Sequence, residues 1–207
     1  MKETFLRLQW VWLTGILYFL VPAPVIAGAP TDQTRDCVDK ILAILKNPEL
    51  RSDGRKKERR ERLRAIIYPR FDFAEMARRS LGSHWSRRPP QEQQQFVKLF
   101  TELLENSYVE KIESYNGETV SYLREKRDKD HAEVLTNIVT AKGEEFSINY
   151  SLHLVGGERK IYDIVVENIS LVNNYRSQFN RILVNATFDE LLKKLQAKTP
   201  EIRGSKG

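Results

Sequence analysis

The spacing of apolar residues changes twice along this chain. Apolar positions recur every three or four residues from 31 to about 116, alternate with polar ones from 117 to 167, and return to the first spacing after 171. A period near 3.6 predicts amphipathic helices, and a period of two predicts strands. The pattern therefore predicts a run of helices, then a sheet, then further helices.

The first run begins with two helices whose ends are marked by proline. Val38, Ile41 and Leu45 share one face of the first helix, which ends at Asn47-Pro48. The second helix is expected to end before Pro69, because proline lacks the N–H group that continues a helix.

A short helix and a long helix complete this run. Asp72 and Glu75 have the spacing of an N-cap and its third helical residue, and Gly82 suits the end of the short helix. Pro89-Pro90 then opens a long helix. Its apolar stripe consists of Phe96, Leu99, Phe100, Leu103, Leu104, Tyr108 and Ile112.

The alternating stretch predicts about four strands, at residues 119–123, 132–140, 146–154 and 160–167. The loops between them are short, so consecutive strands are expected to pair as an antiparallel meander.

The fourth strand is apolar on both faces. Strict alternation places Ile161 and Val165 on one face, and the other face is expected to carry Tyr162, Ile164 and Val166. A strand of this kind is covered on both sides. One cover is the long helix, and the other is a second helix layer or a ligand.

Two helices follow the sheet. The first spans about 171–183, and Thr187 with Glu190 forms a capping box for the second. The helices are segregated from a consecutive sheet. The predicted fold class is therefore α+β, with helices packed on a roughly four-stranded antiparallel meander.

The N-terminus has the pattern of a secretory signal peptide. A short basic start precedes the apolar run Trp10–Val21, and Val25-Ile26-Ala27 offers small residues to a signal peptidase. We predict cleavage after Ala27. An uncleaved anchor is the alternative, although the run is shorter than the roughly 20 residues that span a bilayer. Residues 28–200 would form a single domain and 201–207 a disordered tail.

Composition narrows the class of protein. The chain has 207 residues, 41% hydrophobic and 30% charged, with ten Gly, eight Pro and one Cys, which excludes collagen-like, disulfide-stapled and polytopic membrane proteins. The formal charge is +6, but residues 51–64 hold eight basic and three acidic residues, and the rest of the exported chain is balanced. One basic segment without stacking aromatics does not predict a nucleic-acid partner.

The basic segment has two interpretations. It is either a solvated helix face or a surface that attracts an anionic membrane or an acidic partner. The candidate contacts are Arg55, Lys56, Lys57, Arg59 and Arg60.

Catalytic and metal-binding motifs are largely missing. His84, His131 and His153 are isolated, so no metal site is predicted, and Cys37 lies on an apolar stripe as a core residue would. Asp163 lies in an apolar strand, where burial could make it a general base, as in NTF2-like isomerases and dehydratases. A hydrogen bond at the rim of the sheet is the other interpretation of Asp163.

Two stretches carry a family resemblance. The first lies within 71–108 and consists of Phe71-Asp72-Phe73, Met76-Ala77-Arg78, Leu81-Gly82, Trp85, Gln94, Phe96, Phe100, Leu103-Leu104 and Tyr108. The second runs from Ile161 through YDIVVENISLVNNYRSQF at 162–179. Together they resemble the MlaC family, also called the toluene-tolerance family. Asn168 stands where that family usually has Gly, and Asn is among the few residues that tolerate a positive φ. Arg159 stands where a Trp is common.

The resemblance implies an NTF2-like cone with an apolar lipid cavity. Members of the family carry phospholipid through the periplasm, between an outer-membrane lipoprotein–porin complex and an inner-membrane ABC transporter, and so maintain outer-membrane lipid asymmetry. This chain would then be a lipid carrier, not an enzyme, with no cofactor. A hopanoid-type lipid is the alternative ligand, because a related branch lies among hopanoid-biosynthesis genes.

Eleven positions are candidate lipid contacts, and each is equally compatible with simple core packing. They are Phe100, Leu104, Tyr108, Ile148, Tyr150, Leu152, Tyr162, Ile164, Val166, Tyr175 and Phe179. Arg176 is expected to contact a headgroup or to pair with Asp163 or Glu167. A structural envelope protein with a filled core and no ligand is a third functional hypothesis.

Overall fold

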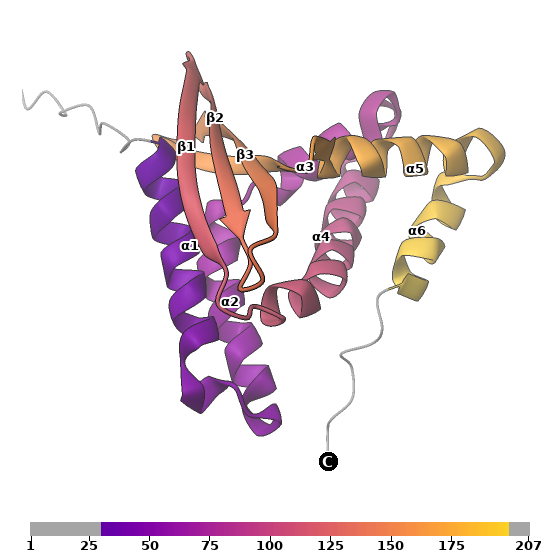
Figure 1. The fold of residues 1–207 in the computed structure, drawn as a ribbon. Coiled ribbons are helices and arrows are strands. Elements are labelled where there is room, and N and C mark those ends of the chain that lie inside the picture. Colours follow the sequence, from indigo (N-terminus) through magenta and orange to yellow (C-terminus); the bar gives the residue numbers. More distant parts are fainter. Residues whose placement is uncertain (1–29, 199–207) are drawn as a thin grey trace, which may run out of the picture.

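The computed structural model describes residues 30–198, so the predicted signal peptide and the tail at 201–207 lie outside the described residues. Helices precede and follow one sheet, which confirms the α+β class (Figure 1). The helices are α1 (Pro30–Lys46), α2 (Lys56–Arg70), α3 (Phe73–Leu81), α4 (Pro90–Glu113), α5 (Leu171–Asn185) and α6 (Phe188–Lys198), with 3₁₀ turns at Pro48–Leu50, Asp53–Arg55 and Gly82–Arg87. The strands are β1 (Thr119–Asp128), β2 (His131–Val139), β3 (Glu145–Val155), β4 (Glu158–Val166) and β5 (Ile169–Ser170).

The sheet is an antiparallel meander in the order β1-β2-β3-β4-β5. It contains one short strand more than the four predicted, and β1 continues five residues beyond the predicted end at Leu123. The extension is polar, from Arg124 to Asp128, and pairs through its backbone with β2. Charged side chains on an edge strand remain solvated while the backbone pairs on one side only.

The turn between β4 and β5 has positive φ at two residues that are not glycine. Glu167 has φ 47° and Asn168 has φ 64°. Two consecutive positive φ angles are typical of the tight hairpin turns that match strand twist. Asn168 therefore adopts the conformation that its residue type tolerates.

Strand β4 shifts register against β3 at Tyr162. Ser151 lies opposite Asp163, but the next residue of β3, Leu152, lies opposite Ile161. Tyr162 is therefore an extra residue without a cross-strand partner, as in a β-bulge. Because directly opposed residues share a face, Ile161 and Asp163 lie on opposite faces although they are only two positions apart.

The bulge corrects the faces predicted for the fourth strand. Ile164 lies opposite Tyr150. Val166 lies opposite Ile148, two residues earlier on the same face of β3. Both therefore share the face of Ile161, and their predicted placement on the other face was wrong. Alternation of faces holds only where no residue is inserted into the strand.

Buried apolar side chains form two clusters. The sheet cluster consists of Ala132, Val134, Tyr150, Leu152 and Ile161. The helical cluster joins α3, α4, α5 and α6 through Met76, Ala77, Leu81, Phe96, Leu99, Phe100, Leu103, Leu104, Val172, Tyr175, Phe179, Phe188, Leu191, Leu192 and Leu195. Figure 1 shows α1 and α2 alongside the sheet and α4, α5 and α6 as a separate group. Phe71, between α2 and α3, packs against both clusters.

Most predicted helix ends are confirmed. The Asp72 carboxylate accepts a 2.9 Å hydrogen bond from the Glu75 N–H, and Gly82 ends α3 with φ 57°. Helix α2 was expected to end before Pro69 but continues to Arg70. Proline in the last turn costs only one internal hydrogen bond. The Pro69 carbonyl in turn accepts a 2.7 Å bond from the Lys160 ammonium group.

Candidate functional site

Four of the predicted lipid contacts lie inside the helical cluster. Phe100, Leu104, Tyr175 and Phe179 are all buried. The Phe100 ring packs edge-on against Tyr175 at 5.2 Å and against Phe179 at 5.8 Å between ring centroids. These aromatic pairs hold α4 and α5 together, so in this structure the four side chains are core residues.

Two further candidates, Tyr150 and Leu152, are buried in the sheet cluster, against which Val38 of α1 also packs. Burial raises the pKa of the Tyr150 phenol, with smaller effects from Tyr122 and Cys37. The hydroxyl therefore stays protonated at any ordinary pH.

The remaining sheet candidates form an incompletely covered surface. Ile148 and Ile164 are half-buried, and Val166 is 41% exposed. Ile169 of β5 lies opposite Val166, on the same face, and is 63% exposed. We call Ile148, Ile164, Val166 and Ile169 the apolar strip. Sequence reasoning missed Ile169, because a two-residue strand after a turn has no recognisable alternation.

Tyr108 lies on α4 at the edge of the helical cluster and is half-buried. Burial raises the pKa of its phenol to about 12, with a further contribution from the neighbouring Tyr175 hydroxyl. Tyr108 is thus the one predicted helical contact that is not fully enclosed.

Tyr162 lies on the face opposite the apolar strip. Its ring contacts the imidazoles of His131 and His153, with centroids 5.9 and 5.2 Å away. The guanidinium of Arg79 lies 4.1 Å from the ring centroid, within the range of a cation–π contact. The structure therefore separates Tyr162 from the other strand candidates.

Asp163 caps helix α5. Its carboxylate accepts hydrogen bonds from the Ser170 hydroxyl and, at 3.0 Å, from the Val172 N–H. Val172 is the second residue of α5, whose first N–H groups have no partner within the helix. This geometry matches the structural interpretation of Asp163, a hydrogen-bond acceptor at the sheet rim.

Arg176 bonds to neither predicted carboxylate. Its Nε donates to the Arg79 carbonyl at 2.8 Å, and its stem lies against Gly82, where an added Cβ would be 3.5 Å from the Arg176 Cδ. Arg176 therefore holds α5 against the end of α3. Within residues 30–198, no group of three His, Cys, Asp or Glu side chains is arranged to bind a metal.

The five basic candidates divide into two groups. Arg59 and Arg60 both bond to Glu113 at the end of α4, with N–O distances of 2.8 and 2.7 Å. Arg55 pairs with Glu58 of its own segment, and both Lys56 and Lys57 are exposed. Of the five candidates, only Arg55, Lys56 and Lys57 are exposed enough to contact a membrane or a partner.

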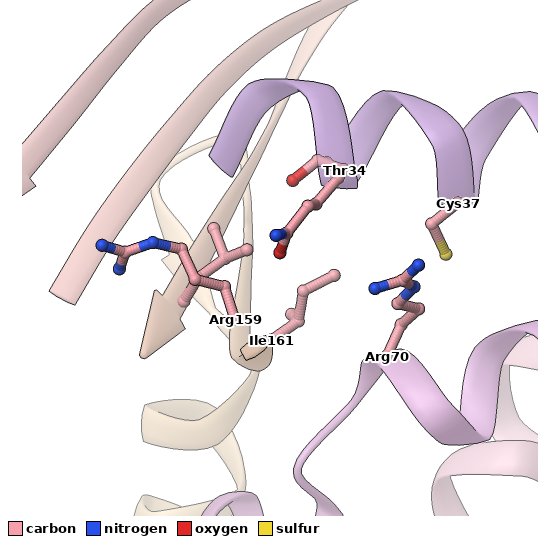
Figure 2. Close-up of a pocket in the computed structure, with 7 residues that line it drawn as sticks. Thr34, Cys37, Arg70, Arg159 and Ile161 are labelled. Carbon is pink, nitrogen blue, oxygen red and sulfur yellow. The ribbon is translucent and has the colours of Figure 1, made fainter. Parts of the chain in front are cut away.

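One pocket lies between α1 and the sheet. Thr34 and Cys37 line it from α1, Arg70 from α2, and Arg159 and Ile161 from β4. Figure 2 shows the Cys37 thiol and the Arg70 guanidinium pointing toward each other across it. The space inside it is too small to hold a water molecule. Pockets for small molecules span about 300–1,000 Å³, so it is too small for a lipid tail.

A second pocket is an open groove of about 360 Å³ at the far end of the helical cluster, lined by His84, Arg87, Arg88, Leu183, Ala186, Thr187 and Phe188. Neither pocket is the enclosed apolar cavity expected from the sequence, and that part of the expectation stays a prediction.

The fold defines a class of α+β proteins in which helices surround an open antiparallel meander. The class includes a phospholipid-binding protein from Ralstonia solanacearum, solved in complex with a phospholipid. The two structures have a TM-score of 0.72 and 26% sequence identity, over 81% of this chain and 95% of that one.

Sequence comparison gives the family. Residues 35–197 match the model of the MlaC protein family, and the chain belongs to that family. An intermembrane phospholipid transport system binding protein, MlaC of Haemophilus influenzae, is 24% identical over 89% of this chain and 91% of its own length. Toluene tolerance protein ttg2D of Pseudomonas putida is 24% identical over 80% of this chain and 79% of its own. No helix within residues 30–198 is long and apolar enough to cross a membrane.

Proposed function

We propose that the chain is a periplasmic phospholipid carrier whose acyl-chain contact includes the apolar strip. The observation that supports this is the exposure of Val166 and Ile169 side by side on one face of a MlaC fold. Adjacent exposed apolar side chains mark a binding surface more often than isolated ones do. The Ralstonia relative was solved with a phospholipid bound, which is the ligand class this surface suits.

A phospholipid carrier must keep the acyl chains of its ligand out of water. Removing each methylene group from water is favourable by about 0.8 kcal/mol, so a phospholipid cannot cross an aqueous space unless its chains are covered. A carrier needs an apolar wall and a way to release the lipid, but it needs no covalent step. The Asp163 carboxylate, with two hydrogen bonds inside the fold, is not required for chemistry in this proposal.

The route of the lipid follows from the family. We place the carrier between an inner-membrane ABC transporter complex and an outer-membrane lipoprotein–porin complex, where it would maintain the lipid asymmetry of the outer membrane. The name of the Haemophilus relative, an intermembrane phospholipid transport system binding protein, supports this placement.

Lipid extraction from the exported protein tests the proposal. We expect mass spectrometry of protein purified from the periplasm to find phospholipid at about one molecule per chain, and Val166→Asp with Ile169→Asp to lower that occupancy. Val184→Asp is the matched control, since Val184 is a 70% exposed apolar residue at the end of α5. Wild-type protein that carries no lipid and takes up none from vesicles would contradict the proposal. If the extract contained a hopanoid instead, the protein would still be a lipid carrier, but its ligand would not be a phospholipid.

A further inference from the structure

The second half of α4 is held by charge and only weakly by apolar packing. The last buried residue of the helix is Leu104, and no residue from 105 to 113 is buried. The same half carries three acidic residues that face α2: Glu105, Glu110 and Glu113. Helix α2 itself buries only Leu63. The contact between these two helices is therefore mainly electrostatic.

The pairs at the end of α4 are the most enclosed part of this contact. The Glu113 carboxylate accepts from the Arg59 Nε at 2.8 Å and from the Arg60 Nη2 at 2.7 Å. The Arg59 side chain is 12% exposed and that of Glu113 is 9% exposed. Arg59 also donates to the Leu50 carbonyl at 2.6 Å, which fixes its orientation. Burial acts to raise the pKa of Glu113, but the bonds from Arg60 and Arg59 outweigh it and hold that pKa below its usual value.

A second pair lies about two turns earlier on α4. Arg64 bonds to Glu105 through both Nε and Nη2, and the Tyr68 hydroxyl donates to the same carboxylate at 2.9 Å. Burial, with help from Glu105, raises the pKa of Tyr68 to about 12, so the phenol stays a donor. Helix α2 thus binds carboxylates of α4 at two places, Glu105 and Glu113.

These contacts lie between two bodies with separate cores. Helix α2 accompanies the sheet cluster, and α4 belongs to the helical cluster. The clusters meet at Phe71, next to which the Asp72 N–H donates to the Ile161 carbonyl at 2.8 Å. We propose that Phe71 is a hinge and that the Arg59/Arg60–Glu113 and Arg64–Glu105 pairs are a latch, which opens α4 away from α2 to admit or release acyl chains.

Ion pairs suit a latch better than apolar packing does. The pairs between α2 and α4 belong to neither apolar cluster, so they can part without exposing either core to water. Salt screens the more exposed Arg64–Glu105 pair most strongly. The enclosed pair re-forms with a specific geometry, because the Glu113 carboxylate must accept hydrogen bonds from both Arg59 and Arg60 at once. The latch gives the proposed carrier a regulated entrance, and in that sense it rests on the proposed function.

The test measures the distance between α2 and α4 directly. Spin labels are placed at Glu61→Cys on α2 and Ser107→Cys on α4, both exposed positions outside the latch, in a Cys37→Ala background. We expect one narrow distance distribution at low salt, and a longer, broader one at high salt or in Glu113→Gln.

A milder variant and a matched control complete the design. Glu105→Gln opens the more exposed pair alone and should lengthen the distance without unfolding the protein, even if Glu113→Gln does not fold. Glu58→Gln removes ion pairs to Arg55 and Arg62 within the α2 segment and should leave the distance unchanged. Equal distributions in wild type, Glu105→Gln and high salt would overturn the latch.

A lipid-transfer assay distinguishes a failure of the latch proposal from a failure of the carrier proposal. In vesicle-to-vesicle transfer of a fluorescent phospholipid, we expect Glu105→Gln to speed uptake several-fold with final occupancy unchanged. Wild-type protein that transfers no lipid would refute the carrier function, while the label distances would still decide the latch. An unchanged uptake rate despite a longer distance would overturn the role of the latch in lipid entry.

Discussion

The Nε2 of His153 lies 3.0 Å from the Oδ2 of Asp72, which ties strand β3 to the first turn of α3. The other oxygen of the same carboxylate accepts the Glu75 N–H, and the Asp72 backbone N–H bonds to β4. One residue beside Phe71 thus joins two strands to a helix of the other cluster. Its side chain therefore keeps the two clusters joined at the proposed hinge.

Replacing Asp72 with alanine removes both side-chain bonds. An N-cap is worth about 1 kcal/mol and a buried hydrogen bond a similar amount, so we expect Asp72→Ala to lower the free energy of unfolding by about 2 kcal/mol. Asn is itself a good N-cap, so Asp72→Asn should cost about half as much. Urea unfolding measures both. Equal losses in the two variants would show that capping contributes nothing here.

Asp163 should be important for stability and not for lipid loading. In Asp163→Ala the Val172 N–H and the Ser170 hydroxyl lose their acceptor, which costs about 1–3 kcal/mol for a buried donor. Asp163→Asn retains one acceptor oxygen and should cost less. We expect lipid per folded molecule to match the wild type in both variants, measured by native mass spectrometry. A folded Asp163→Asn protein that loses its lipid would contradict this structural role.

Glu75 should make the protein more stable above pH 4.5 than below it. Hydrogen bonds from Arg78, and after the opposing effect of burial those from Arg79, lower the pKa of Glu75 to about 2 from 4.5. A carboxylate with a lowered pKa in the folded state stabilises it above the unfolded pKa, and this contribution disappears as the pH falls from about 4.5 to 2. The difference in unfolding free energy between wild type and Glu75→Gln should therefore shrink over that interval. Urea unfolding at several pH values measures it, and a constant difference would refute the assignment.

The capped helix starts were predictable from the sequence because caps are local, whereas the end of α2 was not. The capping bonds of Asp72 and of Thr187 with Glu190 connect residues three apart, and the structure contains both. The bulge at Tyr162 was not predictable, since an inserted residue leaves the apolar pattern of β4 readable as plain alternation. This single insertion moved Ile164 and Val166 to the other face of the sheet.

The site was only partly predictable, for a related reason. A helical stripe shows which side of α4 is apolar, but only the packing of α5 shows that Phe100 is enclosed and Tyr108 is not. The basic run gave no sign that Arg59 and Arg60 pair with Glu113, more than fifty residues away. Such long-range partners depend on tertiary structure, which local spacing does not encode.

The lone cysteine should be unreactive in the folded protein. Burial raises the pKa of the Cys37 thiol to about 11 from 9.0, against smaller effects of Arg70 and Lys40. Because only the thiolate attacks disulfide reagents, its reaction at pH 8 should be roughly 100-fold slower than in the unfolded chain. Absorbance after addition of an aromatic disulfide, with and without denaturing guanidinium chloride, measures both rates. Similar rates would show that the thiol is accessible in the native state.

We expect the residues of the basic segment to have two different roles, some in membrane binding and others in stabilising the fold. Lys56 and Lys57 are exposed without a carboxylate partner among residues 30–198, whereas Arg59 and Arg60 are bonded to Glu113. Each Lys or Arg near an anionic surface adds about 1 kcal/mol of attraction, which salt screens. We expect Lys56→Gln with Lys57→Gln to weaken binding to vesicles containing anionic lipid by roughly tenfold or more at low salt, with unchanged unfolding free energy.

Arg59→Ala serves as the contrasting variant. It leaves the enclosed Glu113 carboxylate with one partner fewer, so it should destabilise the fold by about 1–3 kcal/mol and change vesicle binding little beyond the loss of one charge. Vesicle co-sedimentation at two salt concentrations, paired with urea unfolding, distinguishes the two effects. If the double lysine variant binds anionic vesicles as tightly as wild type at low salt, the exposed lysines are a solvated helix end and the membrane contact lies elsewhere.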